Sequence, residues 1–576
     1  MKILYIVLCC LAAITQLTAQ ATTNVPLNDR NHHIQTRLEI KSGDFGGIHT
    51  TTQPIGRKSI RTYIDTIIDS SYWQQTSQRQ AQYQYLINDN NDEDASLVSK
   101  QPFLKLLYPN KEKSFLGHFY RSPAHLLELR KPNFYVNINP ILHFKAAYES
   151  HNGTTGLVFL NRRGAVIRGN IAERVYFHTD IIESQASFPT YVQQIIARDN
   201  AVPGAGYFKE YNSSFRPDST DGVDYLLATG YIGFELLKNH IGVQLGHGQN
   251  FIGDGHRSLF LSDYSPNYFY IKLNTKVWRL QYQNIFAQLT QNYTTRQRAF
   301  DLAFGRKYLA AHHLSINILD NLNIGLFEGV IFSRGGQFDL QYLNPLIFYR
   351  AVEQAAGSPD NVMVGLNWKW NFLGHFSFYG QAVLDELAIG SLAQNGAGWW
   401  GNKFAFQAGL KYIDAFGVDQ LDIQGEVNLA RPFTYTFRDS TANWTHYNQP
   451  LAHPLGANFY ELIGIVNYQP LPNLYLRAQL NYAVYGQDEP NTNWGGNVHK
   501  PYTTRQLENG NAIGQGVTTQ LLLLQFLATY QLRHNLFADL QLTYRRADAN
   551  IDIYDSSTLL LGVGLRWNIS EKMKDW

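Results

Sequence analysis

Cysteine is almost absent from this chain. Its 576 residues include only Cys9 and Cys10, and both lie in the apolar stretch at the N-terminus. Beyond that stretch no disulfide can form, so a large exported domain would depend on packing and hydrogen bonds alone. Neither cysteine follows the small residue that a lipoprotein signal needs, which argues against a lipid anchor.

The N-terminal stretch has the order of a secretion signal. Lys2 supplies the positive charge, residues 3–14 are apolar, and Leu17-Thr18-Ala19 precedes Gln20 as a cleavage site. The apolar run is too short to span a membrane. We therefore predict a signal peptide at residues 1–19 and export of the remainder.

Charge of one sign and long hydrophobic runs are also missing. The chain has 48 basic and 46 acidic residues, and loss of the signal removes one basic residue, Lys2. The remaining 47 basic and 46 acidic residues nearly balance, so the charge does not indicate a nucleic-acid partner. Mean hydropathy is −0.28, yet aromatic residues make up 14%, with 36 Tyr and 33 Phe. This composition is typical of an outer-membrane barrel, with a secreted soluble β-protein as the alternative.

Residues 20–130 differ in pattern from the rest. Within residues 57–70, Ile60, Tyr63, Ile64 and Ile67 fall on one helical face. Residues 73–87 and 122–129 are further helix candidates. The apolar content is modest, which favours a mostly helical periplasmic cap or plug over an independent domain.

From residue 131 to 576 the period becomes two. In residues 420–429 Leu421, Ile423 and Val427 alternate with Asp422 and other polar residues. We count 18 candidate strands, which begin near residues 133, 157, 174, 225, 240, 268, 277, 309, 322, 361, 375, 403, 419, 458, 474, 519, 536 and 558.

The connections between these strands alternate in length. Short ones lie at residues 275–276, 320–321 and 533–535, and long ones at 185–224, 333–360 and 487–517. This alternation predicts an all-β fold: a transmembrane, antiparallel, up-and-down β-barrel in outer-membrane lipid, with periplasmic termini and extracellular long loops. The loop at Asn395-Gly396 is one of these. Tryptophans near strand ends fit interfacial girdles: Trp278, Trp368, Trp370 and Trp567.

Residues 244–263, QLGHGQNFIGDGHRSLFLSD, form a glycine-rich loop after a strand. Glycine lets the backbone turn sharply where a side chain would clash. We expect Asp254 and Arg257 to pair across Gly255 or to bond neighbouring backbone in a tight turn. We expect the loop to organise the outer face rather than to be the main glycan contact. The candidate residues of this loop are Gly246, Gly248, Asn250, Gly253, Asp254, Gly255, Arg257 and Ser258.

This pattern resembles the Wzi family of outer-membrane capsule-assembly proteins. Residues 274–278 and a second block, 447–459, are closer to the RemB gliding-motility branch of that family. The resemblance implies a barrel that binds or organises surface polysaccharide (capsule or exopolysaccharide), or that supports gliding together with other envelope or motility proteins. Wzi proteins that bind capsule carry tryptophans in this loop, whereas this chain has Phe251 and Ile252.

Aromatic residues in the long loops are the candidate glycan contacts. Sugars present an apolar face and a ring of hydroxyls, which suits aromatic platforms among polar residues. The alternative is that these aromatics pack the loops over the barrel mouth. The candidates are Trp399, Trp400, Trp444, Tyr447 and Trp494.

Other functions have less support. Asp254, His256 and Ser258 share one loop but lack a nucleophile elbow, so we predict no enzyme. His312, His313, His446 and His453 lack the spacing of a metal site, and no cofactor is expected. A porin-type diffusion channel remains the alternative. Lumen charges of both signs favour a closed interior over a channel: Lys411, Asp422, Glu426, Arg477, Asp539, Arg545 and Arg566.

Overall fold

The computed structural model describes residues 22–92 and 119–575, except 132, 173, 212–221, 238–239, 301, 334–336, 358–359, 386–397 and 573–574. The signal peptide and the Asn395-Gly396 loop lie outside the described residues.

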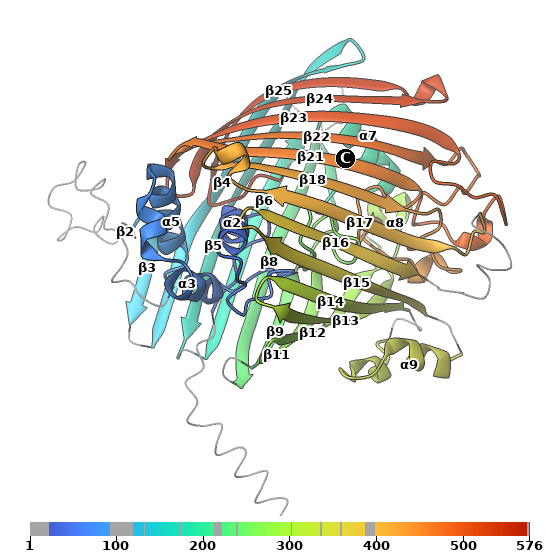
Figure 1. Ribbon diagram of the computed structural model, residues 1–576. Coiled ribbons are helices and arrows are strands. Elements are labelled where there is room, and N and C mark those ends of the chain that lie inside the picture. The colour runs from blue at the N-terminus through green and yellow to red at the C-terminus, as the bar shows by residue number, and fades with distance from the viewer. Residues whose placement is uncertain are drawn as a thin grey trace, which may run out of the picture.

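Eighteen antiparallel strands close into a barrel, each paired with its neighbours in chain order (Figure 1). The barrel closes where the last strand pairs with the first, from Thr558↔His151 to Trp567↔Leu142. The strands are β4 (Phe134–His151), β5 (Thr154–Ile171), β6 (Val175–Ser187), β8 (Gly222–Leu237), β9 (Ile241–Gly248), β11 (Tyr268–Val277), β12 (Leu280–Thr290), β13 (Arg306–Leu319), β14 (Leu322–Phe332), β15 (Asn361–Phe372), β16 (Phe376–Asp385), β17 (Lys403–Tyr412), β18 (Leu421–Ala430), β21 (Phe459–Leu471), β22 (Leu474–Gln487), β23 (Val517–Arg533), β24 (Leu536–Ala549) and β25 (Ser556–Trp567).

The predicted fold class is confirmed, and every predicted strand start lies within three residues of an observed one. The largest differences include residue 277 against Leu280 and residue 157 against Thr154. The two-residue period succeeds because each strand has two different environments. In β18, Asp422 and Glu426 are buried in the lumen, whereas Val427 is 40% exposed on the outside.

The outer face of β25 gives a test of register. Val563 is 60% exposed and points outward with Leu561 and Leu565. Val563→Arg should destabilise the barrel in a bilayer by about 2–4 kcal/mol, because the charge would meet hydrocarbon. Folding titrations into phospholipid vesicles, with Val563→Leu as the control, measure this difference. Equal stability of the two variants would mean that this face does not meet lipid.

The region before the barrel is only partly as predicted. Helices α3 (Arg57–Thr66), α4 (Ser70–Gln74) and α5 (Ser77–Asp89) fall where two helices were expected, and α2 (Arg30–Ser42) was not foreseen. The helix predicted at residues 122–129 is wrong. Strands β2 (Phe119–Ser122) and β3 (His125–Lys131) occupy that region.

Strand β3 forms because part of β4 has a free edge. Strand β25 pairs with β4 only from Leu142 onward, so the earlier part of β4 is not paired with β25. Strand β3 takes up this edge, with Leu127 opposite Ile138. A requirement for backbone hydrogen bonds therefore overrides the local helical pattern.

The helices α2–α5 lie at the barrel end with the short turns (Figure 1). Their apolar faces form one core that includes Phe537 of β24. Arg37 of α2 is 2% exposed and donates to Asp414, at 2.6 Å, and to Asp422. Within the described ranges, no helix has the length and apolarity to cross a membrane. The helices α2–α5 are thus attached to the inner wall of the barrel. We term residues 22–92, which contain them, the plug.

Candidate functional site

The glycine-rich loop between β9 and β11 folds into the barrel lumen. Its short strand β10 (Phe251–Ile252) pairs with β1 (Thr52–Gln53) of the N-terminal region, so the loop reaches the plug. Leu259 and Phe260 are fully buried. The expectation that this loop organises the outer face is therefore wrong in its position, because the loop turns inward from the strand ends.

An apolar layer surrounds this loop inside the barrel. The ring of Phe260 stacks on Phe327 of β14, with 4.6 Å between the ring centres. Trp444, from the long connection after β18, donates its indole N–H to the Phe260 carbonyl at 2.9 Å. Leu451 and Phe459 belong to the same core. The barrel wall, the glycine-rich loop and the connection after β18 thus pack as one unit.

Arg257 holds the loop to two distant parts of the chain. The guanidinium donates to Glu461 of β21 at 2.9 Å and to Asp575, in the segment after β25, at 3.0 Å. Glu426 accepts the backbone N–H groups of His256 and Arg257, at 2.6 and 3.1 Å. All three carboxylates are buried, so the charges stabilise one another away from water.

The expected pair between Asp254 and Arg257 is wrong. Asp254 instead lies 3.1 Å from the ammonium of Lys369 in β15 and accepts from Thr51 at 2.7 Å. Gly255 between them turns the backbone against the wall, where an added Cβ would lie 2.6 Å from Glu426 Oε2. A larger residue here would require the side chains of Glu426 and Gln407 to shift, and the two side chains beside Gly255 point to different partners.

The two blocks that carry the family resemblance meet inside the barrel. Ser262 donates its N–H to the Leu451 carbonyl at 2.8 Å, and its hydroxyl lies 2.5 Å from the Ala452 carbonyl. His453 lies 2.7 Å from Glu461, the same carboxylate that binds Arg257. Residues 246–262 and 447–459 therefore form one structural unit although they are far apart in the sequence.

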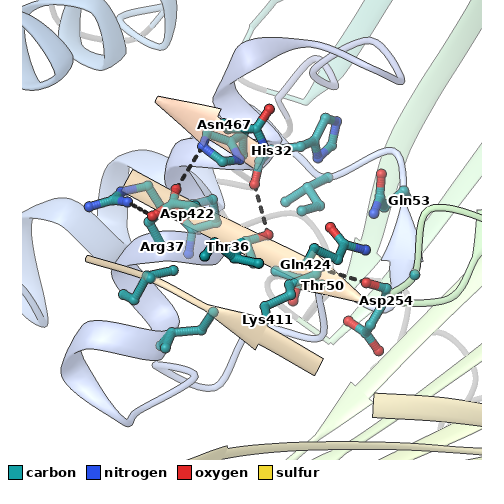
Figure 2. Close-up of a pocket in the computed structure, with 17 residues that line it drawn as sticks. His32, Thr36, Arg37, Thr50, Gln53, Asp254, Lys411, Asp422, Gln424 and Asn467 are labelled. Carbon is teal, nitrogen blue, oxygen red and sulfur yellow. Dashed lines mark hydrogen bonds and ion pairs between the residues drawn. The ribbon is translucent and has the colours of Figure 1, made fainter. Parts of the chain in front are cut away.

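A cavity of about 170 Å³ lies between α2, the loop and strands β17 and β18 (Figure 2). Lys411 projects into it and donates to the Asp254 carbonyl at 2.7 Å. Asp422 faces it from the wall, paired with Arg37 and with His33 at 3.1 Å. Among the described residues, its lining includes no phenylalanine, tyrosine or tryptophan, so they provide no aromatic platform of the kind expected at a stacking sugar site.

The candidate aromatic residues do not form one site. Trp399 and Trp400 are neighbours, with ring centres 5.7 Å apart. Trp400 also lies 4.7 Å from Tyr502, and Arg505 lies 4.3 Å above its ring. The prediction missed Tyr502 and Arg505, although both lie in the long connection 487–517. These four half-buried residues, Trp399, Trp400, Tyr502 and Arg505, form what we term the loop-end aromatic cluster.

The remaining candidates lie in other surroundings. Tyr447 packs against Tyr293 and Phe304, with ring centres 5.9 and 6.0 Å apart. Trp494 is half-buried and lies against Gly516. The proposal that Trp444 contacts glycan is wrong, because it is 1% exposed and bonded within the core.

The described Ser and His side chains of the loop are not arranged as a catalytic pair, because each is bonded to a different partner. The Ser258 side chain is fully buried and donates to the Ile252 carbonyl at 2.5 Å, while His256 lies 2.5 Å from Asp575. The part of the chain that the structure describes contains no cluster of His, Cys, Asp and Glu that could hold a metal ion.

The strand order defines the class: this chain has the fold of an outer-membrane β-barrel. Among solved structures, it is similar to Wzi of Escherichia coli, an outer-membrane protein involved in group 1 capsule assembly and described as a carbohydrate-binding β-barrel. The TM-score is 0.53 at 13% identity, covering 96% of this chain and 100% of that one.

A second barrel, OprD of Pseudomonas aeruginosa, gives a TM-score of 0.39 at 12% identity. That likeness covers 74% of this chain and 94% of that one. No protein-family model matches the sequence, and no curated protein matches it. The similarity therefore concerns the fold.

Proposed function

We propose that this protein binds or organises surface polysaccharide, as an outer-membrane barrel of the capsule-assembly type with extracellular long loops and periplasmic termini. The observation that supports the proposal is that the glycine-rich loop and the N-terminal helices are packed inside the lumen. Lys369 binds Glu39 of the plug at 2.7 Å and Asp254 of the loop at 3.1 Å, which joins wall, plug and loop. A diffusion channel needs an open path, and a filled interior suits a surface-binding role instead.

The loop-end aromatic cluster is the proposed contact for the glycan. Trp399 and Trp400 lie in the long connection from β16 to β17, and the Arg505 guanidinium lies over the Trp400 ring. Indole faces can stack on the apolar face of a sugar, while the guanidinium can donate to hydroxyl or carboxylate groups. If the same attachment serves gliding, cells without the protein should lose surface movement as well as bound polysaccharide.

The double variant Trp399→Ala with Trp400→Ala should fold and yet retain polysaccharide poorly. Loss of two stacking faces should weaken retention by about 1–3 kcal/mol, roughly fivefold to 150-fold, since each aromatic contact contributes about 0.5–1.5 kcal/mol. Cells that express each variant are washed, and their bound polysaccharide is measured.

Trp278→Ala is the matched control, because that indole is 76% exposed at a short turn, on the opposite end. It should retain polysaccharide like the parent. Full retention by the double variant would refute the assigned contact. Stepwise ion currents from the purified parent protein in planar bilayers would refute the closed-barrel function itself.

A further inference from the structure

Part of the outer wall is buried where a barrel strand should meet lipid. In β14, Leu326 is 56% exposed on the outside, and Glu328, Val330 and Phe332 share its side of the strand. These three residues are nevertheless 5%, 0% and 0% exposed. Their alternating neighbours, such as Phe327, belong to the lumen core. Something covers the outer side of this strand.

The cover is the connection from β14 to β15. It contains a 3-10 helix, η5 (Leu340–Leu343), and α9 (Tyr349–Ala355). Tyr342 and Tyr349 are fully buried against Val330 and Phe332. Figure 1 shows α9 outside the barrel, beside β13 and β14. We term residues 338–357 the outer flap.

The flap covers polar groups that face outward from the wall. Glu328 lies 2.8 Å from His312 of β13 and accepts the N–H groups of Tyr349 and Arg350, at 3.0 and 2.9 Å. The hydroxyl of Tyr282 is hydrogen-bonded to His312 at 3.0 Å. A carboxylate facing hydrocarbon is unfavourable, so this cluster requires a cover. The carboxylate also favours the start of α9, where backbone N–H groups are free.

The far side of the flap exposes three large apolar side chains, and the exposed Arg350 of α9 is paired with Glu353 at 2.7 Å. Leu340, Leu346 and Phe348 are 74%, 82% and 75% exposed. The wall beside the flap continues this surface, because Val364 lies opposite Glu328 in β15 and is 39% exposed. Outward-facing apolar residues of a membrane barrel meet lipid. The exposed side of the flap is an extension of that same surface.

We propose that the outer flap is embedded in the membrane on the long-loop side, and that its exposed face binds lipid acyl chains. Hydrocarbon chains are the partner that this chemistry fits, because Leu340, Leu346 and Phe348 are apolar, exposed and adjoin the lipid-facing wall. The inference rests on the barrel lying in a membrane and is independent of polysaccharide binding.

The absence of cysteine after residue 19 makes a direct test possible. In the chain from residue 20 onward, Leu346→Cys is labelled with bimane and the protein is inserted into phosphatidylcholine vesicles with brominated acyl chains. Its fluorescence should fall as much as that of labelled Val563→Cys on the lipid-facing wall. Labelled Leu507→Cys is the matched control. Leu507 is 41% exposed in the loop region near Trp400 and should respond to aqueous iodide instead.

Two results would overturn the proposal. Quenching of the Leu346 label by iodide but not by bromine would place the flap in water. Resistance to both quenchers would mean that protein, such as a second copy, covers the face. Labelled Leu340→Cys serves as a second position if the first variant does not insert.

Discussion

Replacing Arg257 with alanine should destabilise the barrel by about 3–5 kcal/mol, because it removes one partner from a buried ionic network. The guanidinium is 6% exposed and joins Glu461 and Asp575, which are 2% and 4% exposed. Without it, both carboxylates stay buried near Glu426 with one fewer cation. Urea unfolding in detergent, followed by tryptophan fluorescence and by migration of unheated samples, gives the loss.

Arg546→Ala is the matched control for this experiment. Arg546 also pairs with a carboxylate, Asp548 at 2.9 Å, but both side chains are more than half exposed. Such surface pairs contribute about 0–1 kcal/mol, so this variant should unfold with the parent. Arg257→Lys should be intermediate, since one ammonium cannot reproduce the forked contact. A fully stable Arg257→Ala barrel that no longer retains polysaccharide would make the loop itself the binding site.

The barrel could be predicted because its sequence signal is local. Each strand alternates between lumen and exterior, as Asp422 and Val427 do in β18, and short turns such as Asp320-Asn321 divide the pattern. The same reasoning missed β3, whose partner is an edge of β4 left free by β25. It also missed the outer flap, because Glu328 and His312 break the apolar outer face where a later segment covers them.

The site was less predictable because its contacts are long-range. The glycine-rich composition of residues 244–263 indicated a sharply turning loop, and at Gly255 the backbone does lie close to Glu426. The partners of Arg257 lie about 200 and 320 residues away, and no local pattern indicates them. The spacing of Asp254 and Arg257 suggested a local pair, yet the inward turn of the loop offers each a stronger buried partner.

Replacing Asp89 with alanine should release the plug helices while the barrel stays closed. Asp89 accepts from Arg57 of α3 at 2.6 Å, from Asn31 of α2 at 2.8 Å, and from Asn535 in a short turn of the wall at 3.3 Å. The residue is 3% exposed and joins two helices to the wall. Its loss leaves the Arg57 guanidinium without its carboxylate partner, a change that costs about 3–5 kcal/mol. Amide hydrogen exchange should accelerate in α3 and α5 but not in β22–β24.

Asp69→Ala is the matched control for Asp89→Ala. Asp69 also accepts a hydrogen bond at a helix end, from the Ser71 N–H of α4 at 2.8 Å, but this hydrogen bond is exposed to solvent. Loss of that cap should cost only about 1 kcal/mol.

Acid should act like the Asp89 variant. Burial alone would raise the pKa of Asp89, but Arg57 and His534 hold it well below its ordinary value. A carboxylate with a pKa depressed by folding stabilises the folded state above its unfolded pKa, about 3.9, and loses this contribution as pH falls further. The protection of α5 amides, corrected for the intrinsic exchange rate at each pH, should therefore be high at pH 5 and fall only well below pH 4. Low protection already at pH 5, or unchanged protection in Asp89→Ala, would contradict the assigned role of this carboxylate in docking the plug.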